Sequence, residues 1–185
     1  VSIFKAEDLT LAGTLDTVST NANGITATSL ITGSGCRIIA TLAPITLNPA
    51  NLINGIVNAR EWIENTIPEY NGYPFVARHY EITPAINASI ATGRITLYFT
   101  QQEFNDFNAH AGSASDLPTG DGDAVGKANL RIWKFPGTSS DGSGLPATYS
   151  GNAQLINPND ADIVWNKSLN CWEVTFNVIG FSGFI

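Results

Sequence analysis

The strongest constraint on the fold is the alternation of side chains in residues 172–178. Every second side chain in this stretch is large and apolar, and those between are polar. The apolar series is Trp172, Val174, Phe176 and Val178, and the polar series is Glu173, Thr175 and Asn177. A period of two is typical of a β-strand with one buried face. An apolar run at 163–165 and a polar turn at 166–170 precede it, so we predict a β-hairpin over residues 163–178.

A second clear strand is predicted over residues 93–100. Its apolar face carries Ile95, Leu97 and Phe99, and its other face carries Arg94, Thr96 and Tyr98. Further strand-like segments, separated by turn residues, are 25–31, 37–42, 54–64, 73–82 and 128–135. Many short strands between turns predict an all-β fold, with an immunoglobulin-like or a jelly-roll β-sandwich as the two arrangements. We expect residues 1–185 to form a single domain.

Segment 54–64 is the most ambiguous of these strands. Its apolar residues fit one face of a helix, whereas its alternation fits a strand poorly. The turn Asn54-Gly55 and the residue Pro68 bracket the segment, and the surrounding pattern is β. These flanking signals favour a strand.

One short helix is predicted after residue 100. The sequence Thr100-Gln101-Gln102-Glu103 matches a capping box, in which the threonine side chain and the glutamate side chain each satisfy a free backbone amide. We expect this helix to end between Asn108 and Gly112. The Gly- and Ser-rich stretches 111–126 and 136–146 are predicted to be solvated loops.

Composition and charge exclude several classes of partner. Charged residues make up only 14% of the chain, below the roughly 25% of ordinary soluble domains, and the net charge is −7. Because the basic residues are scattered, we exclude nucleic-acid binding. No apolar stretch approaches the roughly 20 residues of a membrane-spanning helix, so no membrane insertion is predicted. The first residues do not resemble a signal peptide, so either a signal has been removed or the chain is an excised domain.

The chain has two cysteines, Cys36 and Cys171. Both precede strand-like segments. In an extracellular protein they are expected to form a disulfide. The alternative is a pair of buried free thiols.

Three aspartates form the best candidate metal site. Asp116, Asp121 and Asp123 lie in one loop that also contains Gly120 and Gly122. Calcium prefers several carboxylate and carbonyl oxygens on a flexible turn, so this loop predicts a calcium site. The alternative is a solvated turn, because Asp and Gly are common in turns of any kind.

The sequence predicts no catalytic site. His79 and Glu81 fall on one face of a predicted strand, which fits either an acid–base pair or a structural polar patch. The pattern Gly-x-Ser-x-Gly of serine hydrolases does not occur, and the two histidines, His79 and His110, lack the spacing of a zinc site.

Exposed aromatic residues suggest a saccharide ligand. Tyrosine and tryptophan combine an apolar ring with a polar tip, which suits an amphipathic sugar. Trp165, Tyr70 and Tyr73 lie near predicted turns and are the candidate ligand-binding residues. Alternation places Trp133 and Trp172 in the core instead.

Three segments resemble a region of large secreted proteins of the Bacteroidetes. These segments are 71–84 (NGYPFVARHYEITP), 97–108 (LYFTQQEFNDFN) and 172–184 (WEVTFNVIGFSGF). In those proteins a similar β-sandwich domain precedes the C-terminal sorting domain that the type IX secretion system reads. The resemblance implies a secreted protein, at the cell surface or in the medium, but it supplies no functional residues.

The sequence therefore predicts a non-enzymatic extracellular module that acts in adhesion or as a structural scaffold. One alternative is a carbohydrate-binding module of a secreted polysaccharide-degrading enzyme. Another is a filament subunit, in which segment 1–11 or 181–185 pairs with the sheet edge of a neighbouring copy. A hydrolase with converging carboxylates is the third alternative. The expected partners are accordingly a polysaccharide or neighbouring copies of the same protein.

Overall fold

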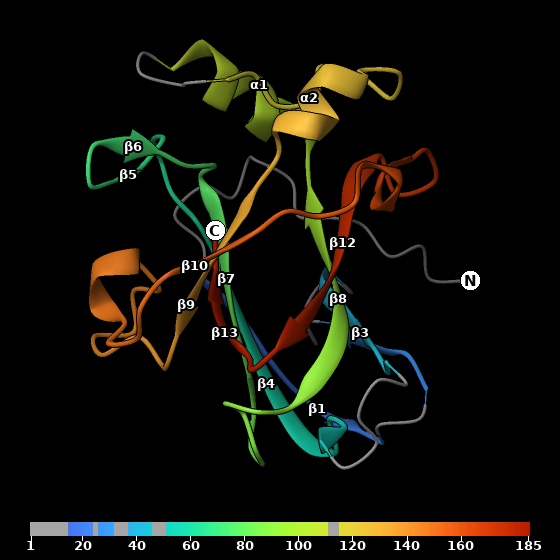
Figure 1. Ribbon diagram of the computed structural model, residues 1–185, viewed down its shortest axis with the longest axis vertical. Coiled ribbons are helices and arrows are strands. Elements are labelled where there is room, and N and C mark those ends of the chain that lie inside the picture. The colour runs from blue at the N-terminus through green and yellow to red at the C-terminus, as the bar shows by residue number, and fades with distance from the viewer. Residues whose placement is uncertain (1–14, 24–25, 32–36, 46–50, 111–114) are drawn as a thin grey trace.

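The computed structural model describes residues 15–23, 26–31, 37–45, 51–110 and 115–185. Their strands form two antiparallel sheets that face each other as a sandwich (Figure 1). The larger sheet has the order β1 (Leu15–Ala22), β4 (Gly55–Ile63), β7 (Arg78–Pro84), β13 (Ser182–Phe184), β9 (Ile132–Pro136) and β10 (Gln154–Ile156). The smaller sheet has the order β11 (Ile163–Asn166), β12 (Cys171–Ile179), β8 (Thr92–Phe99), β3 (Ile38–Ala43) and β2 (Thr28–Ile31). The prediction of an all-β sandwich is confirmed.

The remaining elements are short. Strands β5 (Glu69–Tyr70) and β6 (Tyr73–Pro74) form a separate hairpin. Short 3-10 turns occupy Pro146–Thr148 and Asp160–Asp162. The ambiguous segment 54–64 is strand β4, as the flanking turn signals predicted.

The core lies between the sheets and follows the predicted alternation. In β12 the four apolar residues from Trp172 to Val178 are buried, and Trp172 pairs across the sheet with Phe99 of β8. In β8 the predicted inner residues Ile95, Leu97 and Phe99 are buried in the same cluster. Burial of these apolar side chains is the main stabilising contribution to the fold.

The chain crosses from one sheet to the other between β12 and β13. Gly180 makes this crossing with a φ of +74°, a left-handed conformation that favours glycine. Strand β13 then pairs with β7 on one side and β9 on the other. Segment 181–185, one candidate for pairing with a neighbouring copy, therefore contains an internal strand of its own sheet. The other candidate, segment 1–11, lies outside the described residues.

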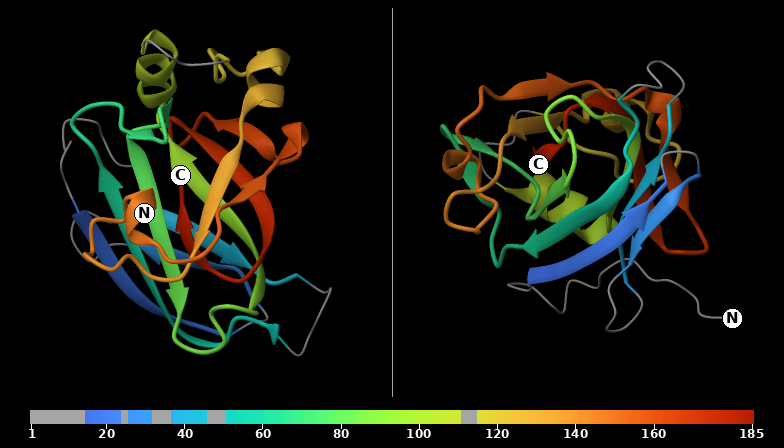
Figure 2. Two further views of the ribbon diagram at one scale, coloured as in Figure 1. Left: turned by 60° about the vertical axis from the view of Figure 1, so that its left-hand side comes forward. Right: turned by 90° about the horizontal axis from the view of Figure 1, so that it is seen from below.

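Two helices cover one end of the sandwich (Figure 2). Helix α1 (Gln101–Ala109) begins with the predicted capping box between Thr100 and Glu103. The ring of Phe104 lies 5.9 Å from that of Trp172, and Trp172 Nε1 donates a hydrogen bond to Gln101 Oε1. Trp172 thus links the helix to the core.

Helix α2 (Ala124–Asn129) was not predicted. Residues 128–130 were assigned to a strand that in fact begins at Ile132. The helix forms because the Asp123 carboxylate accepts a hydrogen bond from the Gly126 amide and so caps its first turn. Loop 111–126 was predicted to be solvated, but its last three residues belong to this helix.

The second loop predicted to be solvated covers the outer face of the larger sheet. Within it Ser139, Gly144 and Pro146 are buried, as is Tyr149 just beyond. The Ser139 amide donates a 2.7 Å hydrogen bond to the carboxylate of Glu81 in β7. Most of the loop is solvated as predicted, with Thr138, Ser140 and Asp141 exposed, but this hydrogen bond also anchors the loop to the sheet.

Candidate ligand-binding site

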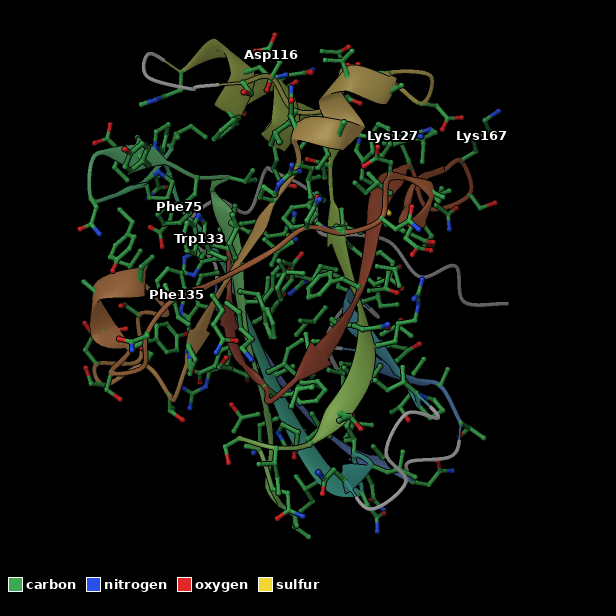
Figure 3. The ribbon with its side chains drawn as sticks, viewed as in Figure 1. Phe75, Asp116, Lys127, Trp133, Phe135 and Lys167 are labelled. Carbon is green, nitrogen blue, oxygen red and sulfur yellow. The ribbon has the colours of Figure 1, made fainter. Side chains whose placement is uncertain are left out.

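A pocket of about 260 Å³ opens beside the helices, on the outer side of β9. Four aromatic residues line it: Tyr73 from β6, Phe75 after that strand, Phe107 from α1 and Trp133 from β9. Figure 3 shows Phe75, Trp133 and Phe135 following one another down the same side of the molecule. We refer to this cavity as the aromatic pocket.

The alternation of β9 explains why aromatic rings reach the surface here. Ile132 and Lys134 are buried on the inner face, which leaves Trp133 and Phe135 on the outer face. The ring of Phe135 lies 6.5 Å from that of Trp133 and 5.3 Å from that of Tyr70. Neighbouring rings therefore support Trp133 while 41% of its surface remains exposed.

Polar groups lie among the rings of the aromatic pocket. Asn129, Arg131 and Ser115 are part of its lining. Arg131 Nη1 donates 2.7 Å hydrogen bonds to the carbonyl oxygens of Ala128 and Leu130, which orient the guanidinium group. Within the described protein, Arg131 Nε and Nη2 have no hydrogen-bond acceptor. The pocket thus combines apolar rings with a fixed donor, the usual composition of a small-molecule site.

The three predicted ligand-binding residues have different positions. Tyr73 lines the aromatic pocket and is 72% exposed. Tyr70 is half-buried against Phe135, so it supports the wall behind the pocket. Trp165 is half-buried against Trp172, with the two ring centroids 5.6 Å apart, and does not line the pocket.

Trp133 lies on the outer face of β9, so the prediction that it belongs to the core was wrong. Trp172, for which the same prediction was made, is buried in the core. The error arose because the inner face of β9 carries a lysine, Lys134. A charged residue at an inner position made the face with the aromatic residues look like the core face.

Two of the three predicted calcium ligands, Asp121 and Asp123, have other side-chain partners in the structure. The Asp123 carboxylate accepts hydrogen bonds from the Gly126 amide and from the amide and hydroxyl of Thr119, and these bonds lower its pKa. Asp121 lies 3.8 Å from Lys127 Nζ. Among the described residues, no three His, Cys, Asp or Glu side chains are grouped to hold a metal ion. Calcium binding by Asp116, Asp121 and Asp123 stays a prediction.

Cys171 is buried, and it forms no disulfide within the part of the chain that the structure describes. It packs with Ile38 and Tyr98, and burial raises the pKa of the thiol to about 12. Cys36 lies outside the described residues, so the predicted disulfide between Cys36 and Cys171 stays a prediction.

His79 is paired with Glu64, although the sequence analysis weighed Glu81 as its partner. His79 Nε2 lies 2.9 Å from Glu64 Oε1, and its ring stacks on Trp62 with centroids 5.2 Å apart. The His79 side chain is fully buried, and this burial lowers its pKa. A histidine enclosed in this way cannot reach a substrate, which favours the structural interpretation.

A buried ion network lies between the sheets below helix α1. Arg78 Nη1 donates to Glu61 Oε1 at 2.6 Å, and Arg78 Nε donates to Glu103 Oε1 at 2.7 Å. All three side chains are almost inaccessible. Burial raises the pKa of Glu61, while the two carboxylates raise that of Arg78 against its own burial. This network joins β4, β7 and α1 and thereby supports the end of the sandwich that carries the aromatic pocket.

No family model, no curated protein and no solved structure matches this chain. The resemblance to Bacteroidetes surface proteins therefore stays a prediction. None of the described helices is long and apolar enough to cross a membrane.

Proposed function

We propose that this chain is a non-enzymatic extracellular module that attaches its parent protein to a saccharide through the aromatic pocket. The observation that carries this proposal is the exposure of Tyr73 and Trp133 around one cavity. Large apolar groups at the surface of a domain commonly mark a binding site. Adhesion to a glycan-covered surface is the role that we infer.

The lining of the aromatic pocket suits a sugar better than a purely apolar ligand. A pyranose ring presents C–H groups on its faces and hydroxyl groups around its edge. The rings of Tyr73 and Trp133 offer apolar surfaces for the faces, and Arg131 offers donors for the hydroxyl groups. Both requirements are met within one cavity.

Binding without catalysis is supported by the chemistry of the lining. Glycoside hydrolysis ordinarily requires two carboxylates on opposite sides of the scissile bond. The described residues that line the aromatic pocket include no Asp, Glu or His. The lining therefore favours a binding module over a hydrolase.

Affinity electrophoresis through a panel of polysaccharides tests this proposal. We expect at least one polysaccharide to retard the wild-type chain. Trp133→Ala and Tyr73→Ala should each weaken that retardation at least about tenfold, the loss typical of a central interface residue. Val164→Ala is the matched control, because Val164 is an exposed apolar residue of β11, outside the pocket.

Repeating the electrophoresis with calcium and with EDTA separates the two predicted sites. Loss of retardation in EDTA would assign a role to the loop of Asp116, Asp121 and Asp123. Retardation that is unchanged in both pocket variants would refute the proposed site. The absence of retardation by every polysaccharide would refute saccharide binding itself.

Two other roles remain as alternatives. If the chain is a carbohydrate-binding module, the same pocket would bind the saccharide, and the parent protein would be a polysaccharide-degrading enzyme. A scaffold or filament subunit is favoured by a different observation: β10 is an edge strand, and its Leu155 is 54% exposed. Electron microscopy of the purified chain would detect filaments, and Leu155→Lys should abolish them if β10 is the contact.

A further inference from the structure

A second cavity, of about 410 Å³, lies at the other end of β9. It is lined by the end of β9, by the turn after β12, and by residues of β7, β10 and β13. None of its lining residues belongs to the aromatic pocket. Its volume falls within the range of small-molecule sites. We refer to it as the lysine cavity, after Lys134.

Lys134 is the only charged residue among the described lining of this cavity. The residue is only 5% exposed. Its ammonium group donates hydrogen bonds to the carbonyl oxygens of Ile179, at 2.6 Å, and Gly180, at 3.3 Å. These two bonds leave one N–H of the ammonium group available.

The charge of Lys134 is not compensated by the described protein. Among the described residues no carboxylate forms an ion pair with Lys134, whereas buried lysines are normally paired with an anion. Burial alone lowers the pKa of the ammonium group, and no neighbouring negative charge raises it. A buried cation in this situation would be stabilised by an anion from outside the chain.

A buried hydroxyl group also lacks a partner. Ser182 Oγ is buried and has no hydrogen-bond partner within the described protein. Ser182 lines the lysine cavity. Buried polar groups in native proteins are nearly always satisfied, so an orphan hydroxyl beside a cavity indicates an unidentified partner.

The sheet register brings Ser182 close to Lys134. Phe184 pairs with Lys134 across β13 and β9, and Ser182 pairs with Pro136. Ser182 and Lys134 are therefore diagonal neighbours in adjacent strands, which places their β-carbons within about 7–8 Å. A single planar group with two acceptor oxygens can accept a hydrogen bond from each.

We propose that Lys134 and Ser182 form a binding site for the carboxylate group of a small ligand. One ammonium charge neutralises one carboxylate charge, and the Ser182 hydroxyl group donates a hydrogen bond to one of its oxygens. A phosphate dianion fits less well, because the site offers one cation and no arginine fork. A sugar acid is the matching ligand class, since its hydroxyl groups can also reach Gln154 in the lining.

Calorimetric titration of the full chain with glucuronate tests this site, with glucose as the neutral analogue. We expect glucuronate to bind at least tenfold more tightly than glucose, because only glucuronate carries the carboxylate group. Lys134→Met should weaken glucuronate binding at least tenfold, and Ser182→Ala should weaken it about two- to tenfold, as for the loss of one hydrogen bond. Lys167→Met is the matched control, because Lys167 is exposed and outside the cavity.

An NMR titration of the wild-type chain keeps the test independent of variant folding. The Cε signal of Lys134 should shift with glucuronate, and that of Lys167 should not. Failure of glucuronate and acetate to bind, binding that is unchanged in Lys134→Met, or binding of sulfate alone would each overturn the carboxylate site. Trp133→Ala should leave glucuronate binding intact, so failure of this site and failure of the aromatic pocket can be distinguished.

Discussion

Replacing Arg78 with methionine should lower the free energy of unfolding more than the removal of any other single charge proposed for this chain. The substitution removes hydrogen bonds of 2.6 Å to Glu61 and 2.7 Å to Glu103, and it leaves both carboxylates buried. Hydrogen bonds to charged groups contribute about 1.5–3 kcal/mol each, so two of them amount to about 3–6 kcal/mol. Breaking a buried ion pair on one side costs about 3–5 kcal/mol. We therefore expect a loss of about 4 kcal/mol in the free energy of unfolding.

Equilibrium denaturation in urea at neutral pH measures this loss. The matched control is Arg94→Met, because Arg94 also lies 2.6 Å from a carboxylate, that of Asp162. Both side chains of that pair are about one-third exposed. Solvent screening limits an exposed pair to about 0–1 kcal/mol, so Arg94→Met should cost little. The two pairs have equal distances and differ mainly in burial.

A compensating variant separates charge burial from lost packing. Adding Glu61→Gln and Glu103→Gln to Arg78→Met removes the two uncompensated charges and should recover at least about 2 kcal/mol. Glutamine also serves at the third position of a capping box, so the start of α1 should be retained. A loss for Arg78→Met within about 1 kcal/mol of that for Arg94→Met would refute the reasoning. So would a triple variant no more stable than the single one.

Three further predictions concern single sites. Burial lowers the pKa of His79, so the contribution of this residue to stability is present above the ordinary pKa of about 6.5 and is lost as the pH falls through the lowered value. Denaturation between about pH 5 and 8 should show a free energy of unfolding that falls toward acid pH, and His79→Gln should reduce that fall. An equal fall in the variant would contradict this. Gly126→Ala should destabilise by about 1–3 kcal/mol, although alanine favours helices, because its Cβ would lie 2.6 Å from the Pro118 Cα. Gly122→Ala has nothing within 4 Å and should be tolerated, so equal melting temperatures for the two alanine variants would contradict the clash. Asp123→Asn should lower the melting temperature less than Asp123→Ala does, because asparagine can still cap the helix but lacks the second oxygen that accepts from Thr119. Equal losses for the two variants would contradict the capping role.

The sequence predicted the strands whose two faces differ most in polarity. Trp172 and Ile95 lie in regular alternations, and both are buried as expected. The capping box at Thr100 was equally clear, because it depends on residues only three apart. Local patterns of this kind are retained in the fold because the neighbouring strands bury the same apolar face.

The aromatic pocket and the lysine cavity could not be predicted in the same way. Both depend on β9, where Lys134 faces inward and Trp133 faces outward, against the usual distribution. Whether a lysine can be buried depends on carbonyl groups of the turn after β12, more than 40 residues away. Only the register of β13 between β7 and β9 brings these groups together.

The most direct test of the proposed saccharide site is an indole NMR spectrum of the wild-type chain, recorded with the polysaccharide that retards it most. The chain has four tryptophans, and only Trp133 lines the aromatic pocket. We predict that the indole N–H signal of Trp133 shifts on binding and that the signals of Trp62, Trp165 and Trp172 do not. A shift of the Trp165 signal with that of Trp133 unchanged would contradict the proposed site. It would indicate that the ligand binds at Trp165, one of the ligand-binding residues predicted from the sequence.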